Sequence, residues 1–303
     1  MRRILAWTAV VALLGAAAAA VWGAQRVGSL RAERVAGDVH VLFGAGGNVG
    51  VLATPEGAVV VDTLTFRMLG ERVREMAEGL AGAPVVAVVN THYHVDHTHG
   101  NPGFPPGLAI VATRRTRELL EERDARYWAG ERAASLPSVL LDERHELRVG
   151  GRTVEVLHLG RGHTGGDVVV RFVEARVLHT GDLFFNGRYP RIDLEGGGSL
   201  PAWIETLDRV LALDFERVIP GHGPVSDRAG VVAFQAFLRE LWSEAQAAAA
   251  AGRSLEETLA SARLTRDAGY ASMHIPFVVR IDRRSALEQA WTEAVAARAA
   301  RAP

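Results

Sequence analysis

Short apolar runs, split by glycine and proline, dominate the pattern of the first half of the chain. The runs 40–43, 49–52 and 58–62 predict strands of a meander, because each is apolar or alternating and is bounded by turn residues. Residues 63–80 carry apolar side chains at helical spacing and predict an amphipathic helix. The apolar run 84–89 predicts a buried strand that leads into a cluster of polar residues.

Strands and helices continue to alternate along the rest of the chain. We expect a strand at 109–112, a charged helix at 113–131, and strands of a second sheet at 139–141, 146–149, 152–158, 167–173 and 176–179. A helix at 201–213 and a strand at 217–219 follow, and helices at 229–251, 255–263 and 284–301 close the chain. This order favours an α/β (α+β) fold in which two mixed β-sheets pack together between outer helices.

The N-terminus has the pattern of an export signal. Arg2 and Arg3 precede an uncharged run over 4–23, and cleavage after Ala20 fits the small-residue rule for such signals. The run is also long enough to span a membrane, so 1–24 is either a cleaved signal peptide or an N-terminal membrane anchor. Either reading predicts a periplasmic or secreted body, or one anchored in the inner membrane and facing the periplasm.

Composition excludes several classes of partner and site. The chain has 34 basic and 35 acidic residues and no long basic run, so nucleic acid is not expected as a partner. It has no cysteine, which excludes disulfides and thiolate metal ligands. Membrane contact is expected only through the N-terminal segment, and the oligomeric state stays open.

The most informative feature is a cluster of polar side chains after the strand 84–89. His92, His94, Asp96 and His97 lie within six residues of one another. Open α/β sheets bind ligands at the carboxyl ends of their strands, and imidazole nitrogens with a carboxylate suit zinc, iron or manganese. The cluster therefore predicts a metal site, against the alternative of a solvated histidine-rich loop.

Three later residues repeat this placement. His163, Asp182 and His222 each follow a predicted strand by a few residues, and each lies among glycines that allow a sharp turn. A single histidine at a strand end is weak evidence for a metal ligand. Four strand ends that carry only histidine and aspartate make a shared metal site the better interpretation.

The pattern His-x-His-x-Asp-His at 92–97, with the three downstream residues, resembles the metallo-β-lactamase-fold metallohydrolase superfamily. The resemblance covers about 35–223, and the segment 178–190 is similar to an exported bacterial branch of that superfamily. It implies a four-layer αββα sandwich for a catalytic domain at 35–228, with a C-terminal helical extension at 229–303 packed on this domain.

The resemblance also implies two bound metal ions, expected to be Zn²⁺ with iron or manganese as alternatives. The ligands that it implies are His92, His94 and His163 for the first ion, Asp96, His97 and His222 for the second, and Asp182 for both. Because an aspartate occupies the bridging place and cysteine is absent, this set is more similar to the glyoxalase II and lactonase pattern than to lactamases with a cysteine ligand.

The implied reaction is hydrolysis by a hydroxide shared between the two ions, which attacks an ester, thioester, lactone or lactam of a small molecule. Asp96 is the expected catalytic residue, since it would orient the nucleophile and carry a proton to the leaving group. Asp62 is expected to accept a hydrogen bond from a ligand histidine and fix its tautomer. A β-lactamase proper, an iron-dependent oxidoreductase and a non-catalytic binding protein on the same fold are the alternatives.

Other polar residues near these positions receive lesser roles. His179 is expected to pack within its strand, and His158 to lie in the core or beneath the site. Tyr189 either lines the groove or packs on a helix. The glycine-rich segment 44–48 lacks the Lys-Ser/Thr of a phosphate-binding loop and is expected to be a hairpin loop.

Overall fold

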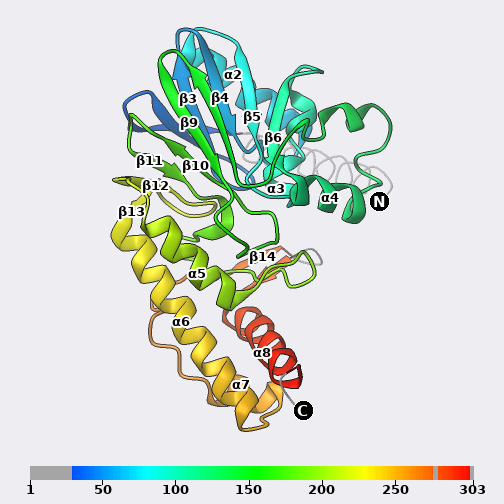
Figure 1. Ribbon diagram of the computed structural model, residues 1–303, viewed down its shortest axis with the longest axis vertical. Coiled ribbons are helices and arrows are strands. Elements are labelled where there is room, and N and C mark those ends of the chain that lie inside the picture. The colour runs from blue at the N-terminus through cyan, green and yellow to red at the C-terminus, as the bar shows by residue number, and fades with distance from the viewer. Residues whose placement is uncertain (1–28, 276–278, 301–303) are drawn as a thin grey trace, which may run out of the picture.

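The computed structural model describes residues 29–275 and 279–300, and the predicted signal or anchor at 1–24 lies outside this part. Two β-sheets pack face to face at one end of the molecule, and a group of helices extends from the other end (Figure 1). None of the helices in the described ranges is long and apolar enough to cross a membrane.

The first sheet has seven strands in sequence order. They are β1 (Arg31–Ala36), β2 (Val39–Phe43), β3 (Val49–Thr54), β4 (Gly57–Val61), β5 (Val85–Val89), β6 (Ala109–Thr113) and β7 (Val139–Leu141). Pairing is antiparallel from β1 to β4 and parallel from β4 to β7. Both faces of the valine-rich strands β4 and β5 are covered, as their nearly continuous apolar sequences require.

The second sheet has six strands and packs on the first. Its order is β13 (Ser226–Asp227), β12 (Arg217–Ile219), β11 (Val177–His179), β10 (Val169–Phe172), β9 (Arg152–Leu157) and β8 (Arg144–Val149). Only the β11–β12 pair is parallel. Val41 and Val61 of the first sheet and Val156 and Val170 of the second belong to one buried cluster, which is the core between the sheets.

Helices cover the outer faces of both sheets and complete the four layers. Helix α2 (Arg67–Ala81) buries Leu69 and Val73 against strands of the first sheet. Helices α5 (Leu200–Leu211) and α6 (Arg228–Ala250) pack Trp203 and Phe234 against the outer face of the second sheet. The predicted αββα sandwich of two mixed sheets is therefore confirmed.

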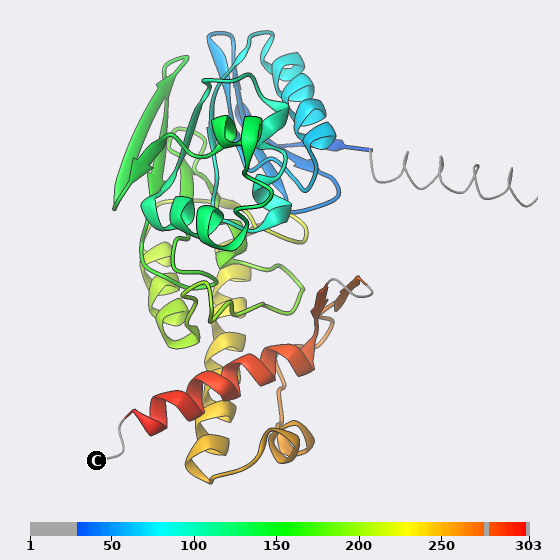
Figure 2. The ribbon, with the colours of Figure 1, turned by 90° about the vertical axis from the view of Figure 1, so that its right-hand side faces the viewer.

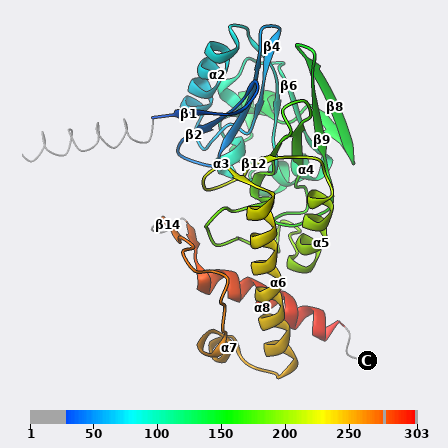
Figure 3. The ribbon, with the colours of Figure 1, turned by 90° about the vertical axis from the view of Figure 1, so that its left-hand side faces the viewer.

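The C-terminal part projects from the sandwich. Helix α6 runs away from the second sheet, α7 (Leu255–Ser261) follows at its far end, and α8 (Arg283–Ala299) packs across α6 (Figures 2 and 3). The hairpin of β14 (Met273–Ile275) and β15 (Val279–Ile281) turns back towards the sandwich. The sequence pattern did not predict this hairpin or strand β1.

Two sequence-based expectations were wrong. The helix expected at 113–131 is α4 (Arg114–Arg123), followed by a 3-10 turn at Gly130–Ser135, because Asp124 leaves the helix to pair with His99. The strand at 139–141 belongs to the first sheet, where it extends the parallel ladder from β6. An apolar run alone does not say which of two sheets will accept it.

The helix expected at 63–80 begins four residues late, at Arg67. Asp62 and Leu64 both have left-handed backbone conformations, with φ of 66° and 69°. Such values are rare outside glycine and mark a backbone that surrounding contacts hold in place. The chain turns sharply here, and this turn carries the Asp62 carboxylate towards the ends of neighbouring strands.

Candidate metal centre

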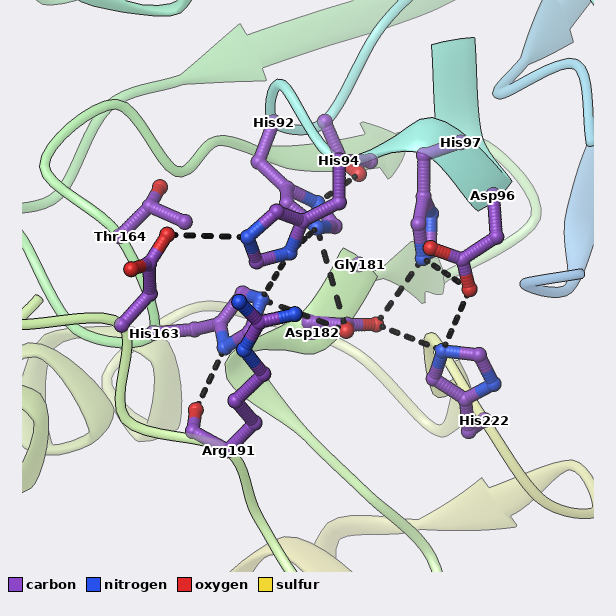
Figure 4. Close-up of polar contacts among 12 residues, drawn as sticks. His92, His94, Asp96, His97, His163, Thr164, Gly181, Asp182, Arg191 and His222 are labelled. Carbon is purple, nitrogen blue, oxygen red and sulfur yellow. Dashed lines mark hydrogen bonds and ion pairs between the residues drawn. The ribbon is translucent and has the colours of Figure 1, made fainter. Parts of the chain in front are cut away.

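The candidate ligands come from four loops that meet at one end of the two sheets. The segment after β5 carries the first four, on the approach to and within the short helix α3 (Val95–Thr98). His163 lies between β9 and β10, Asp182 in the turn after β11, and His222 after β12. All seven side chains converge on a common centre (Figure 4).

Three histidines and one carboxylate oxygen form a first cluster. Nδ1 of His94 lies 3.1 Å from Nε2 of His92 and 2.8 Å from Nε2 of His163. Oδ2 of Asp182 lies 3.4 Å from Nε2 of His163 and 3.9 Å from Nε2 of His92. Four donor atoms therefore face one small volume.

A second cluster lies beside the first. Nε2 of His222 is 3.2 Å from Oδ2 of Asp96, and Nε2 of His97 is 3.6 Å from that same oxygen. Oδ1 of Asp182 is 3.3 Å from Nε2 of His97 and 3.5 Å from Nε2 of His222. The two oxygens of Asp182 thus face different clusters, so this carboxylate lies between them.

Four of the five ligand histidines have a hydrogen-bond partner for the ring nitrogen that points away from the centre. These partners are Thr91 Oγ1 for His92, Asp193 for His94, Asp62 for His97 and the Arg191 carbonyl for His163, at 3.1, 2.9, 2.8 and 2.6 Å. Because carboxylate and carbonyl oxygens only accept, and Thr91 Oγ1 already donates to Asp62, the outer nitrogens carry the protons. The inner nitrogens of the first cluster then present bare lone pairs to the centre.

The residues therefore fit a pair of cations. Lone pairs from three neutral imidazoles that face one another at about hydrogen-bonding distance repel unless a positive charge lies between them. Nε2 of His97 and Oδ1 of Asp182 are buried and have no hydrogen-bond partner among the described residues. Buried polar atoms are almost always paired, so both atoms are accounted for if they bind metal.

Comparison with known proteins decides the family. The model of the metallo-beta-lactamase superfamily matches residues 42–222. The chain belongs to the metallo-β-lactamase superfamily. The match begins in β2 and ends at His222, so it covers most of the two sheets and every candidate ligand, and it excludes α6 to α8.

Curated relatives within this superfamily are distant. The chain is 27% identical over 175 residues to the 2,4-dinitroanisole O-demethylase subunit alpha of Nocardioides sp.. The aligned region covers 55% of this chain but only about half, 49%, of that relative. It is 28% identical over 181 residues to the metallo-beta-lactamase type 2 of Bacillus cereus, covering 59% of this chain and 67% of that protein. These relatives have different names and activities, so the superfamily alone does not define the reaction.

Solved structures share the fold. A metallo-beta-lactamase from Pontibacter korlensis superposes with a TM-score of 0.61 at 22% identity, covering 70% of this chain and 99% of its own. The DIM-1 metallo-beta-lactamase gives a TM-score of 0.58 at 24% identity over 70% of this chain and 97% of its own. The part shared with these structures is the αββα sandwich. Similarity at this level shows the fold and does not identify a substrate.

Two buried carboxylates hydrogen-bond ligand histidines of the candidate centre. Asp62, expected in this role from the family resemblance, accepts from His97 Nδ1 and from the backbone and hydroxyl of Thr91 at 2.7–2.8 Å. Asp193 hydrogen-bonds His94 and the Tyr93 hydroxyl, and sequence reasoning missed it. No local motif marks Asp193, because its partners lie about a hundred positions earlier in the chain.

The charges of the two clusters differ in the absence of metal. Burial lowers the pKa of His163 to about 3, so the first cluster holds neutral imidazole. Burial disfavours charge on His97 and His222, but the neighbouring carboxylates, Asp182 and Asp96 among them, together outweigh it. They raise the pKa of His97 well above its usual value and that of His222 to about 9. A cation that enters the second cluster must therefore displace protons, which makes its affinity fall as the pH is lowered.

Other residues weighed from the sequence lie outside the centre. His179 is buried in β11, as predicted, and its Nε2 hydrogen-bonds the Asn48 carbonyl. His158 hydrogen-bonds the Asp167 carbonyl beside the site. His99 stacks on Tyr127. Tyr189 packs against α6 and donates to Asp267, so the alternative of a tyrosine packed on a helix is confirmed.

The hairpin loop 44–48 closes over the second cluster. The Gly47 amide donates to the Asp96 carbonyl at 3.1 Å, and a Cβ at Gly47 would overlap the His97 imidazole ring. We predict that Gly47→Ala displaces that ring and lowers the affinity of the second cluster for Zn²⁺ by at least about tenfold, as for other changes to groups that orient a ligand. Zinc titration against a competing chelator measures this effect.

Gly79→Ala is the matched control for that substitution. Gly79 lies in α2, and a Cβ there meets nothing within 4 Å. It should leave zinc affinity unchanged and slightly stabilise the helix. Equal zinc affinities for the two variants would show that the close approach of Gly47 to His97 has no part in metal binding.

Proposed function

We propose that this protein is a dinuclear metal-dependent hydrolase of small-molecule esters, thioesters, lactones or lactams. One observation carries the proposal: the two oxygens of the buried Asp182 carboxylate face two separate donor clusters. A site for one metal ion does not require a second donor cluster. A purely structural site does not require a cluster that solvent can reach. Zn²⁺ is the proposed metal because all donors are imidazole nitrogens and carboxylate oxygens, with iron or manganese as alternatives.

Two divalent cations at this centre would supply an activated water at neutral pH and polarise the substrate oxygen. The protein groups then orient the reactants and move protons. The Asp96 side chain is 33% exposed, whereas the Asp182 side chain is 5% exposed and that of His97 is fully buried. Asp96 is therefore the ligand within reach of solvent and substrate, which supports its proposed role in orienting the nucleophile and delivering a proton to the leaving group.

The bridging carboxylate favours ester, thioester or lactone hydrolysis over a β-lactamase proper in this proposal. An iron-dependent oxidoreductase on the same fold is the other alternative. We also propose that the protein acts outside the cytoplasm, from the export-signal pattern at its N-terminus. Cell fractionation of the full-length chain tests that location, and accumulation in the cytoplasm would contradict it.

A hydrolysis screen on metal-analysed protein tests the function. Protein purified without chelators should contain close to two metal ions per chain and hydrolyse at least one class among activated thioesters, lactones, esters and β-lactams. Removal of the metal should abolish turnover, and added Zn²⁺ should restore it. Turnover that requires iron and consumes oxygen would reject hydrolysis in favour of the oxidoreductase.

The position of Arg191 indicates a preference for substrates that carry a negative charge. Its carbonyl anchors His163, and its guanidinium extends beside that ring towards the centre, close enough to disfavour the charged form of His163 (Figure 4). Its positive charge also acts on Tyr93 and Asp193 at the same edge of the site. We propose that Arg191 binds an anionic group of the substrate.

A pair of esters that differ only by a carboxylate tests this role. Arg191→Ala should lower kcat/KM for the carboxylate ester by about 10- to 100-fold, the loss typical of one charge-assisted hydrogen bond, and leave the neutral ester within about twofold. Arg191→Lys should restore part of the preference, because it keeps the charge but loses the two-pronged geometry. An equal loss for both esters would contradict substrate binding by Arg191.

A further inference from the structure

The loop between Asp182 and α5 anchors two of the three histidines of the first cluster. The carbonyl of Arg191 accepts from Nδ1 of His163 at 2.6 Å. The carboxylate of Asp193 holds Nε2 of His94 at 2.9 Å. These anchors are separated by one residue, so the position of a single short segment decides where two inner nitrogens point.

Helix α8 holds the residue between these anchors. The backbone N–H of the buried Ile192 donates to Oε1 of Gln289 at 2.7 Å. No other acceptor is recorded for that N–H among the described residues. The contact joins the loop between Asp182 and α5 to helix α8. This helix lies beyond residues 42–222, the part that matches the superfamily model.

Further contacts tie the same loop to the C-terminal part. The N–H of Leu200, at the start of α5, donates to Oε2 of Glu293 at 2.8 Å, and Glu293 also belongs to α8. The Ala271 amide donates to the Gly187 carbonyl at 2.9 Å. Both contacts join the C-terminal part to the loop, yet neither adjoins Arg191 or Asp193. Among the described residues of the C-terminal part, Gln289 is the one that hydrogen-bonds the segment between the two anchors.

We propose that Gln289 is a positioning residue for the first metal cluster, so that α8 is a working part of the metal centre. This inference rests on the proposed metal binding. Without the Gln289 oxygen, the buried Ile192 N–H has no partner, and the segment must shift to reach water or another acceptor. Because both anchors flank Ile192, the shift turns the rings of His94 and His163 together and loosens the first cluster. Among the described residues, no hydrogen bond or ion pair joins Asp96, His97 or His222 to this segment.

Three substitutions on α8 separate positioning from general stability. Gln289→Met keeps the length and helical preference of the side chain but removes the acceptor. Gln289→Glu keeps an oxygen at the same place. Glu293→Met removes the other α8 acceptor, at Leu200, without touching the anchors. Thermal unfolding confirms that each variant is folded, and a folded Gln289→Asn, whose amide is one methylene too short, replaces Gln289→Met if the latter does not fold.

The readout is zinc release during titration with a competing chelator, with the step of the first cluster assigned in a His222→Ala background. Gln289→Met should release the first zinc at about 10- to 100-fold lower chelator concentration than the unmodified protein, the range expected for a group that orients metal ligands. Gln289→Glu should stay within about threefold of the unmodified protein. Glu293→Met should lower the Tm and leave both release steps unchanged.

The outcomes distinguish this inference from the proposed function. If the unmodified protein binds none of zinc, iron and manganese, the proposed function fails, and the inference fails with it. If the unmodified protein binds two zinc ions and Gln289→Met releases them at the same chelator concentrations, only the inference is overturned. Equal shifts for Gln289→Met and Glu293→Met would also overturn it, since they would reflect loss of general stability.

Discussion

Replacing Asp182 with asparagine is expected to remove metal from both clusters at once and to abolish turnover. Asparagine has almost the same volume, but it carries no charge and only one oxygen. In the native protein each Asp182 oxygen lies within 3.5 Å of a ligand histidine, with Oδ1 facing one cluster and Oδ2 the other. Among the seven candidate ligands, Asp182 is the one whose two oxygens lie beside different groups of histidines.

The expected size of the Asp182→Asn effect follows from its position. Residues that only support a ligand typically change metal affinity or activity by about 10- to 100-fold, and a shared ligand should exceed that range. We predict less than one metal ion per chain after dialysis and a fall in kcat/KM of at least about 1000-fold. Asp214→Asn, which changes an exposed carboxylate paired with Arg176, is the control and should retain both metals. Full metal content in the Asp182→Asn protein would contradict the bridging role.

Replacing Asp62 with alanine is expected to affect stability and the second metal together. The fully buried Asp62 carboxylate accepts three hydrogen bonds, two from Thr91 and one from His97. Each buried donor left without an acceptor costs roughly 1–3 kcal/mol, so the free energy of unfolding should fall by about 3 kcal/mol or more. The His97 ring also loses the contact that fixes its tautomer, which should weaken zinc binding in the second cluster by about 10- to 100-fold.

Asp62→Asn separates two causes of that effect. Asp62 has a left-handed backbone with φ of 66°, which asparagine tolerates better than alanine does. If the carboxylate charge matters most, Asp62→Asn should lose zinc from the second cluster yet unfold at a higher temperature than Asp62→Ala. Thermal and denaturant unfolding of both variants measure the difference in stability. Chelator titration of both variants measures zinc binding in the second cluster. Unchanged zinc binding in both would show that Asp62 does not orient His97.

The candidate metal centre was largely predictable because its residues are marked by local sequence. Strand ends marked by valine runs and glycine turns carry His92, His163, Asp182 and His222 to one edge of the sheets. A parallel or mixed sheet brings such ends together whatever the details of the loops. Asp62, which directly follows a buried strand, was expected as a supporting residue from the family resemblance.

The parts that could not be predicted depend on contacts between distant segments. Asp193 and Gln289 lie in segments without a repeating pattern, and their partners are about a hundred positions away. Helix α4 ends early because Asp124 pairs with His99, a contact that helical propensity cannot anticipate. Strand β7 joins the first sheet because the edge of β6 is free to accept it, and this depends on the fold as a whole. Tertiary contacts therefore decided the features that periodicity left open.

Anomalous diffraction from crystals of zinc-reconstituted protein, recorded at the zinc absorption edge, tests the central claim most directly. We predict two peaks per chain, one among His92, His94 and His163 and one among Asp96, His97 and His222, with an oxygen of Asp182 bound to each. A single peak, or zinc bound elsewhere while these seven side chains keep their present contacts, would contradict the dinuclear centre on which the proposed hydrolase activity depends.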